Sequence, residues 1–457
     1  MRPSRTPSGP GTSGTVRLKF INHACLMIED DKAILLLDPW LEGLAFNNSW
    51  SLLDQSTSNS TLLESLVEAG KPVTVWYSHE HSDHFSVHFL RLLAQALPFS
   101  TVCFQATLDR RVAQFIRTTG LRVVELNGER FSVSDLIDLW CWPQEGGDSY
   151  CLIRAGGSWL LNMNDCVVKT RMQAALVRDK VSAIAPSIDL AFLQFGYANW
   201  AGNPSEIELR TAVANEKLAR IALQIEVFQP DLVIPFASFI SFCAPENAYL
   251  NVEQNSPATL RRAPVLESYQ SRVAFMAPAQ EVVLDSWTSS SLLKKSNDAE
   301  LHWQAAFDEP PVMVVADQEI PLDGLVSDWW RFRKRAFCAF AFLPQILEAV
   351  RLITPIRVHL SDLGQVLRLS YLRGARPETD EGRWDISMSS GVLGYTLGND
   401  FGFSTTHVGG RFRVAPESSI EVVLRFFTVQ AYLRDGWGLR HPVRSARKLL
   451  ALLARRA

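Results

Sequence analysis

Short apolar runs alternate with polar breaks along the first 280 residues of the chain. Their length and their β-branched and aromatic content predict strands, and several longer segments with apolar residues three or four positions apart predict helices. Strands alternating with helices in this way are typical of a layered α/β domain, which we expect over residues 16–290. The predicted strands are 16–21, 25–29, 33–38, 73–78, 101–105, 122–126, 136–142, 150–155, 158–163, 180–195 and 230–239, and the predicted helices are 60–70, 87–97, 108–118 and 205–228.

The pattern changes beyond residue 280. The segment SWTSSSLLKKSNDAE, residues 286–300, has the polarity of a linker, and residues 327–350 predict an aromatic-rich helix. Strand-like runs follow, which indicates a second, α+β domain over residues 300–457 that caps the substrate pocket. Residues 1–15 are rich in Pro, Gly, Ser and Thr and predict a disordered tail. The strand-like runs of the second domain are 356–362, 366–374, 383–389, 407–414 and 419–427.

Composition narrows the class of protein. Hydrophobic residues make up 47% of the chain and charged residues 20%, as in a globular protein, and the net charge of -3 gives no reason to expect nucleic-acid or membrane binding. No apolar run approaches the roughly 20 residues of a membrane span. The start of the chain lacks the apolar core of a signal peptide, and the 7 cysteines are scattered without a C-x-x-C pair. We therefore expect a cytoplasmic protein with free thiols and no stable membrane insertion.

The segment HEHSDH, residues 79–84, follows the predicted strand 73–78. Residues two apart at the end of a strand project to the same side, so His79 and His81 are expected to share one metal ion. Asp83 and His84 come at a strand-to-helix turn, from which they can face a second metal position. The sequence therefore predicts a metal site here.

This motif resembles that of the metallo-β-lactamase superfamily. The resemblance implies an αββα sandwich with a mononuclear or dinuclear site at the sheet edge. It further implies that Asp38, which closes AILLLD, lies below the metals, and that Asp165, in NMNDC, bridges them. His23 is expected beside the ligands, in a supporting position. The segment DLVIPFAS corresponds to the strand that leads to the last histidine of the superfamily.

The chain departs from that pattern at two ligand positions, because no histidine lies between His88 and His302. In the loop CWPQEGGDSYCLI, Glu145 is the preferred candidate for the first missing ligand, and Asp148 is the alternative. At the second position, after PFAS, we expect water, substrate or a histidine of the second domain to take the place of the missing ligand. Those histidines are His302, His359 and His407.

The donors then number three imidazoles and three carboxylates. Zinc favours nitrogen and sulfur donors, whereas mixed imidazole and carboxylate donors suit non-haem iron, so we expect two iron ions, with two zinc ions as the alternative. Four segments, DPWLEGLAFNNSWSLL, NMNDC, QFGYANWAGN and IPFASF, resemble the lactamase-like part of the CMP-N-acetylneuraminate hydroxylases. The Rieske motif of that family is missing. The exchange of histidine for carboxylate also resembles the di-iron monooxygenases of this fold in natural-product biosynthesis, of the chloramphenicol β-hydroxylase type and the platensimycin and platencin diterpenoid hydroxylase type.

These resemblances imply a non-haem di-iron monooxygenase of antibiotic biosynthesis that uses O2 to hydroxylate an apolar, carboxylate-bearing metabolite, for example a diterpenoid. The chain has no GxGxxG fingerprint and no iron–sulfur spacing, so electrons would come from an external ferredoxin and reductase. The alternatives are a dinuclear zinc hydrolase of a phosphodiester, lactone or amide, and a binding protein with a vestigial site. Aromatic and amide residues of two loops are expected to form the substrate pocket: Trp40, Asn47, Trp50, Gln194, Tyr197, Asn199 and Trp200.

Overall fold

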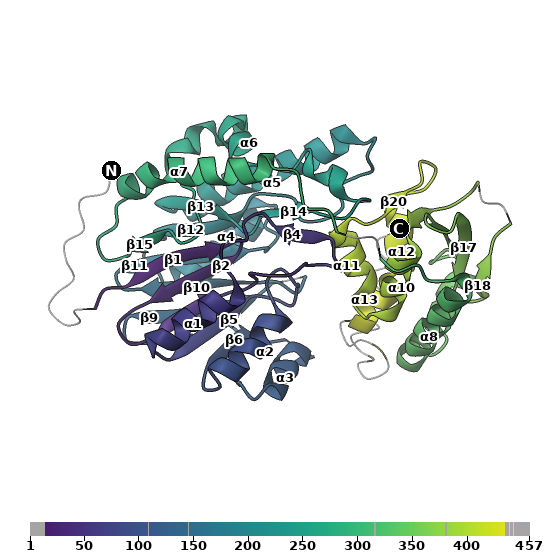
Figure 1. Cartoon of the computed structure of the whole chain (residues 1–457), viewed down its shortest axis with the longest axis horizontal. Helices are drawn as coiled ribbons and strands as arrows, with labels where there is room; N and C mark the ends of the chain where they lie inside the picture. The colour runs from purple at the N-terminus through teal and green to yellow at the C-terminus, as the bar shows by residue number, and fades with distance from the viewer. Residues whose placement is uncertain are drawn as a thin grey trace.

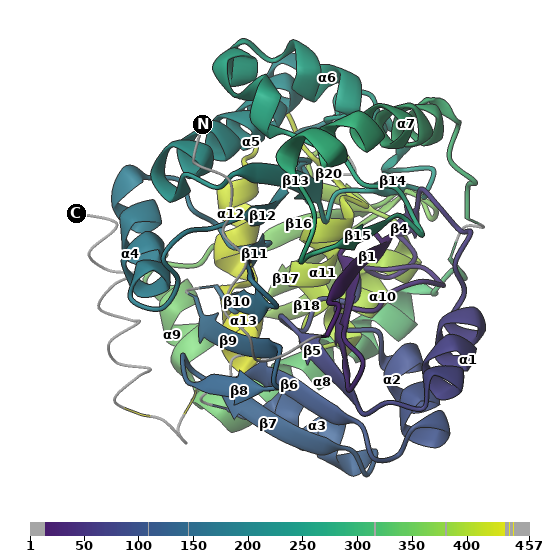
Figure 2. The same cartoon turned by 90° about the vertical axis from the view of Figure 1, so that its left-hand side faces the viewer.

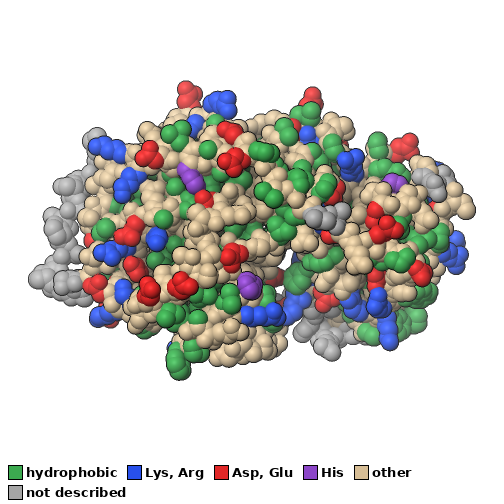
Figure 3. Space-filling model, viewed as in Figure 1, with side chains coloured by type: hydrophobic (Ala, Val, Ile, Leu, Met, Phe, Trp, Pro, Cys, Tyr) green, Lys and Arg blue, Asp and Glu red, His purple; other side chains and the backbone are tan. Residues whose placement is uncertain are grey.

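The structure is a computed structural model that describes residues 14–107, 109–144, 146–314, 317–379 and 382–434, together with residues 438 and 442. Two lobes lie side by side, the larger formed by the first three hundred residues and the smaller by the remainder (Figure 1). The surface is notched between them (Figure 3). The predicted tail lies outside the described residues, apart from residues 14 and 15.

Two sheets form the centre of the larger lobe. In the first, β3, β5, β6 and β7 are parallel, and the antiparallel meander β1–β2–β3 extends it to β15 at the edge. This seven-stranded sheet has the order β15 (Glu281–Val283), β1 (Arg17–Asn22), β2 (Cys25–Glu29), β3 (Ile34–Leu37), β5 (Val73–Tyr77), β6 (Thr101–Gln105) and β7 (Arg122–Leu126). The six-stranded sheet has the order β13 (Leu232–Phe236), β12 (Leu190–Gln194), β11 (Ser158–Asn164), β10 (Ser149–Ala155), β9 (Ile137–Pro143) and β8 (Arg130–Ser132).

Helices cover both outer faces of this pair of sheets (Figure 2). On the seven-stranded sheet, Leu66, Phe89 and Ile116 join its apolar residues in one buried cluster. The helices on that side are α1 (Asn59–Ala69), α2 (Val87–Ala96) and α3 (Arg111–Thr118). On the other side lie α4 (Arg171–Ser182), α5 (Ile207–Phe228), α6 (Pro257–Arg262) and α7 (Ser289–Asp308), with the short turns η1 (Ala248–Asn251) and η2 (Pro264–Arg272).

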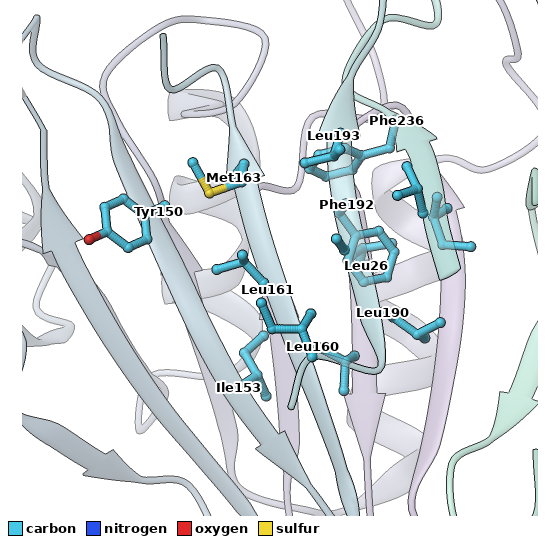
Figure 4. Packing of buried hydrophobic residues seen from close by; sticks show 14 of the residues in the cluster. Leu26, Tyr150, Ile153, Leu160, Leu161, Met163, Leu190, Phe192, Leu193 and Phe236 are labelled. Carbon is cyan, nitrogen blue, oxygen red and sulfur yellow. The ribbon is translucent and has the colours of Figure 1, made fainter. Parts of the chain in front are cut away.

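The main core of the larger lobe joins the facing sides of the two sheets. Leu26 of the first sheet belongs to the same buried cluster as Leu161 and Phe192 of the second (Figure 4). The cluster continues into the helices through Val177 and Ile221. The architecture is thus helix, sheet, sheet, helix, which confirms the predicted α/β sandwich.

The smaller lobe has its own sheet and its own buried cluster, in which Trp329 and Phe426 stack at 5.6 Å. The sheet has the order β18 (Gly374–Pro377), β17 (Gln365–Ser370), β16 (Ile356–Leu360), β19 (Ile386–Met388) and β20 (Arg413–Val414). The helices are α8 (Leu322–Phe340), α9 (Leu343–Ala349), α10 (Ser390–Gly398), α11 (Gly402–Gly409), α12 (Ile420–Phe426) and α13 (Thr428–Arg434).

Several predicted elements are wrong. Residues 286–300 are not a linker, because Thr288 caps helix α7 with a capping box and Trp303 of that helix is buried in the larger core. Residues 419–427 form helix α12 rather than a strand, since Val423 and Phe426 are three positions apart and bury one face. The first residues of the predicted strand 407–414 belong instead to helix α11, which ends before the left-handed Gly410. Residues 180–182 finish helix α4, so the predicted strand 180–195 is confined to β12.

The division into domains at residues 290–300 stays a prediction, and helix α7 runs across it. Between the lobes, β4 (Trp50–Leu52) pairs with β14 (Ile240–Phe242) beside a buried aromatic cluster. All 7 cysteines are free. None of the described helices has both the length and the apolar character that crossing a bilayer requires.

Candidate metal centre

The ends of three strands bring acidic and imidazole side chains together. Strands β3 and β5 are parallel neighbours, so their carboxyl ends meet at one edge of the sheet, where Asp38 follows β3 and the segment 78–84 follows β5. Asp165 follows β11 of the facing sheet. The two sheets therefore present their ligand-type residues to each other across one edge of the sandwich.

Three groups of ligand-type atoms lie there, each with its atoms within 4.8 Å of one another among the described residues. His79 Nε2 lies 3.7 Å from Asp148 Oδ1, and His81 completes this first group. His23 Nε2 and His84 Nε2 lie 3.5 and 3.3 Å from Asp83 Oδ2, which makes a separate group.

Asp165 connects the two groups. Its Oδ2 lies 3.9 Å from His79 Nε2 and 3.5 Å from His84 Nε2. A carboxylate oxygen between two imidazoles of different groups has the position of a bridging ligand. The arrangement therefore fits two neighbouring metal ions, one on each side of Asp165.

Buried polar atoms without partners support this fit. Both ring nitrogens of His23, Asp83 Oδ1 and His84 Nε2 are buried and make no hydrogen bond to the part of the chain that the structure describes. Leaving such atoms unpaired costs about 1–3 kcal/mol each. Nitrogen and oxygen atoms that converge in this way are the donors that a divalent metal ion would satisfy.

The electrostatics of the centre show how tightly its charges are coupled. Burial, reinforced by the neighbouring imidazoles, lowers the pKa of His79 and of His81 to about 4. Burial acts in the same direction on His84, but the carboxylates of Asp83 and Asp165 outweigh it and raise its pKa well above the usual value. Burial would raise the pKa of Asp83, yet the adjacent His84 and His23 hold it well below its usual value. Imidazoles and carboxylates thus compensate one another at short range.

Asp38 orients the histidines. It is buried and accepts hydrogen bonds from the backbone N–H and hydroxyl of Ser78 at 2.8 and 2.7 Å and from Asn164 Nδ2 at 2.6 Å. His84 Nδ1 lies 3.1 Å from Asp38 Oδ2, and His79 Nδ1 lies 2.9 Å from the Ser78 hydroxyl. Because these contacts use Nδ1, the Nε2 atoms of both rings face the centre.

Asp165 is held from the opposite side. Gln194 Nε2 donates to Asp165 Oδ1 at 2.9 Å, and Lys217 Nζ of helix α5 donates to Gln194 Oε1 at 2.9 Å. The lysine fixes which way the amide points, so that the NH2 group faces the carboxylate. Oδ2 of Asp165 is thereby left toward the histidines.

The loop that was expected to supply the missing ligand is described only in part. Glu145 lies outside the described residues, whereas the alternative, Asp148, reaches His79. The three histidines considered for the last position have other surroundings. His302 lies 3.1 Å from Asp54, His359 contacts Ser387, and His407 lies beside Trp200. His23, which was expected in a supporting position, lies with Asp83 and His84 in one of the three groups, and its role stays a prediction. Its place in the β1–β2 turn gives no local signal of metal binding.

The residues expected to form the substrate pocket divide into two sets. Trp40, Trp50 and Tyr197 are buried in the aromatic cluster between the lobes, where Trp50 packs on Phe46 at 4.5 Å. The others make specific hydrogen bonds: Asn47 O accepts from Arg411, Asn199 Nδ2 donates to Trp200 O, Trp200 N donates to His407 O, and Gln194 holds Asp165. Their contact with substrate stays a prediction.

Comparison with known proteins shows relatives that are hydroxylases. No protein-family model matches the chain. It is 26% identical over 260 residues to the cytidine monophosphate-N-acetylneuraminic acid hydroxylase of Danio rerio, a match covering 54% of this chain and 42% of that protein. With the hydroxylase of the same name from Mus musculus it shares 22% identity over 426 residues, which cover 89% of this chain and 72% of the mouse protein. The chain thus spans less than half of the fish protein that it matches.

Solved structures with a similar fold include a point mutant of CmlA beta-hydroxylase. That chain has a TM-score of 0.41 and 14% identity, with 60% of this chain and 55% of that one covered. Others are metallo-β-lactamase fold proteins. The expected resemblance to the CMP-N-acetylneuraminate hydroxylases is confirmed.

Proposed function

We propose that the protein is a metal-dependent hydroxylase, and specifically a non-haem di-iron monooxygenase that acts on an apolar, carboxylate-bearing small molecule. The observation that carries this proposal is the position of Asp165 Oδ2 between His79 and His84, at 3.9 and 3.5 Å. One ion would be held by His79, His81 and Asp148, and the other by His23, Asp83 and His84, with Asp165 shared. The names of the sequence relatives, which are hydroxylases, support the reaction class.

Iron is favoured over zinc by the oxygen content of this donor set. Three carboxylates and four imidazoles leave open positions on two ions and suit non-haem iron. Such a centre supplies O2 activation when iron is bound, with two electrons from an external ferredoxin and reductase. The chain itself orients the ligands: Asp38 and Ser78 fix the imidazoles, and Gln194 fixes Asp165. A diterpenoid is one metabolite of this chemical class, and antibiotic biosynthesis is the setting that we propose.

Metal analysis tests this proposal directly. Protein produced with both iron and zinc available should hold two iron ions per chain, with the Mössbauer signature of an exchange-coupled pair. Reduced protein should consume O2. Asp165→Asn should abolish the coupled signature because it removes the charge shared by the two ions, whereas Asp179→Asn, an exposed change on helix α4, should not.

A dinuclear zinc hydrolase is the second candidate, favoured by the four imidazoles that converge at the centre, since nitrogen donors suit zinc. In that case bound zinc supplies a water of lowered pKa. Zinc-loaded protein would then cleave a phosphodiester, lactone or amide without O2. Full anaerobic turnover of such a substrate would reject the monooxygenase and establish the hydrolase.

A further inference from the structure

A cavity of about 320 Å³ lies in the smaller lobe, among helices α11, α12 and α13. This volume is at the lower end of the range for small-molecule sites, about 300–1,000 Å³. Phe403, Leu424 and Phe427 give it apolar walls. None of the seven proposed metal ligands lines it. Figure 1 shows α11 and α13 on the side of the smaller lobe that is turned toward the larger one.

His407 contributes an imidazole to the cavity wall. Its imidazole makes no hydrogen bond to any residue that the structure describes, and aromatic rings surround it: Phe412 at 6.2 Å, Phe403 at 6.4 Å and Trp200 at 6.5 Å between centroids. Burial lowers its pKa to about 4, so the ring is neutral near pH 7. A neutral imidazole offers one donor and one acceptor. The imidazole, which is partly exposed, is therefore available to a polar group on a ligand in the cavity.

Arg434 and Asp400 are the charged residues of the cavity lining, and a second arginine lies near the first. Arg434 lines the cavity and donates to the Ser404 hydroxyl at 3.2 Å. The guanidinium groups of Arg434 and of Arg111, which belongs to helix α3 of the larger lobe, lie 6.0 and 4.6 Å from the centre of the Phe401 ring. One arginine from each lobe thus lies beside Phe401, and Arg111 itself stands outside the cavity lining. Guanidinium groups bind carboxylates with paired, charge-assisted hydrogen bonds.

This arginine pair lies near the segment that carries the histidine motif. The positive charges of Arg111 and Arg434 both act on Glu80, which lies between His79 and His81 in the chain. On another side, the backbone of His407 accepts a hydrogen bond from Trp200 N at 2.9 Å, and Trp200 belongs to the loop that begins after Gln194. The cavity is therefore joined to the centre through two separate segments.

We propose that this cavity binds the apolar body of a small organic carboxylate, with its carboxylate at Arg111 and Arg434 and His407 bonded to a polar group on the body. The inference rests on the proposed function in one respect, because it takes this molecule to be the hydroxylation substrate.

Calorimetric titration of the full-length, metal-loaded protein with 1-adamantanecarboxylate tests the proposal, with 1-adamantanemethanol as the neutral analogue. We expect the acid to bind. Ala431→Trp, which fills the cavity, should weaken binding of both compounds at least tenfold. Arg434→Gln should weaken binding of the acid at least tenfold and leave binding of the alcohol unchanged. Arg425→Gln, an exposed arginine on α12 that does not line the cavity, is the matched control and should change neither.

His407→Phe guards against a trivial loss of folding, since it keeps the ring and removes only the two nitrogens. This variant should keep the thermal unfolding temperature of the wild type and bind both compounds more weakly. The proposal is overturned if the acid does not bind, or if its binding is the same in Ala431→Trp, or if chelation of the metal abolishes it, because binding would then occur at the metals. Neither O2 nor turnover enters this measurement. Absence of hydroxylase activity with intact binding would reject the proposed function alone.

Discussion

Both ring nitrogens of His23 are buried without a hydrogen-bond partner among the described residues, and Nε2 lies 3.5 Å from Asp83 Oδ2. Ala237 N donates a hydrogen bond to His23 O at 3.0 Å. This bond fixes the backbone of the turn from which the imidazole projects. The imidazole pairs with the Asp83 carboxylate, yet neither of its nitrogens is used in a hydrogen bond to the described residues. Ligation of a metal ion beside Asp83 and His84 is the use that we infer.

His23→Ala should therefore reduce the metal content from two ions to one per chain. Loss of groups that merely support ligands weakens metal binding about 10–100-fold, and loss of a ligand should exceed that. Metal analysis after gel filtration measures the change. His88→Ala, an exposed histidine on helix α2 close to the same motif, should keep both ions. Two tightly held ions in His23→Ala would show that the imidazole is not a ligand.

Lys217 provides a pH-dependent contribution to stability. It is only 8% exposed, and burial, with the charge of Arg220, lowers its pKa from 10.5 to about 8. Between these two values the unfolded chain binds a proton that the folded chain does not, so this group makes the folded state more stable as pH rises from 8 toward 10.5. The full effect is on the order of 3 kcal/mol.

Urea unfolding at several pH values tests this effect by difference. Wild type should gain stability relative to Lys217→Met as pH rises through the window from 8 to 10.5. Lys180→Met, at an exposed position on helix α4, should follow the wild-type profile. Parallel profiles for wild type and Lys217→Met would mean that the lysine has the same pKa in both states.

The sequence predicts the compact part of the candidate centre and misses its distant parts for a physical reason. His79, His81, Asp83 and His84 come together through the local geometry of one strand end, which their spacing reveals. His23 and Asp148 arrive from other turns, and only the pairing of strands decides how near they lie. Glycine-rich loops such as GGDS can place either of two acidic residues at the same point, so the choice between Glu145 and Asp148 could not be made from the sequence.

At the scale of elements, the loop before β4 is held by the smaller lobe. Phe46, Asn47 and Asn48 have φ values of 52°, 55° and 58°, a left-handed turn that costs energy at residues other than glycine. Phe46 packs edge-on against His81 at 5.5 Å. Arg411, 2% exposed, donates to Asn47 O at 2.9 Å and pairs with Glu246 and Asp317 at 2.6 and 2.8 Å.

Gly409 allows this close approach, because a Cβ there would collide with the Ser49 hydroxyl. Asn247 adds a bridge, since its Nδ2 donates to both Ser49 O and Gly409 O. The smaller lobe therefore positions a loop that touches a proposed ligand. Arg411 acts through Phe46 and is a positioning residue.

Arg411→Ala should loosen the loop and destabilise the protein. Removing one partner of a fully buried ion pair costs about 3–5 kcal/mol, and we expect about 2–3 kcal/mol here because Glu246 and Asp317 are partly exposed. Hydrogen exchange of the amides at 45–50 should accelerate, and the spectroscopic signature of the bound metal should change through His81. Arg413→Ala, its exposed neighbour, should affect neither. A destabilised variant with an unchanged spectrum would limit Arg411 to a structural role.

The hydrophobic pattern predicts the helices and strands of the larger lobe more accurately than those of the smaller lobe. Strands such as β5 and β10 are buried on both faces, so their continuous apolar runs identify them. The β-branched run in SIEVVLRFF suggested a strand, yet Val423 and Phe426 pack as one helical face against the smaller sheet. Tertiary packing overrides intrinsic propensity where the apolar residues of a short segment fit both the helical and the strand periodicity.

At the scale of the whole molecule, the two lobes and the metal centre form one connected unit. The centre joins the two sheets, since Asp165 comes from one and the segment 78–84 from the other. The aromatic cluster and Arg411 then connect this edge of the sandwich to the smaller lobe. An ion bound at the centre is thus attached to both halves of the core.

Metal binding should consequently stabilise the entire fold. The unfolded chain has no assembled site, so an ion at 100 times its dissociation constant contributes about 2.7 kcal/mol. Chelation followed by dialysis should lower the unfolding temperature in scanning calorimetry by a few degrees, and anaerobic addition of Fe(II) should restore it. In Asp165→Ala, which lacks the carboxylate that both ions would share, the same chelation should produce a smaller shift. An identical unfolding temperature for metal-loaded and chelated wild type would mean that the buried imidazoles and carboxylates compensate one another without a metal ion.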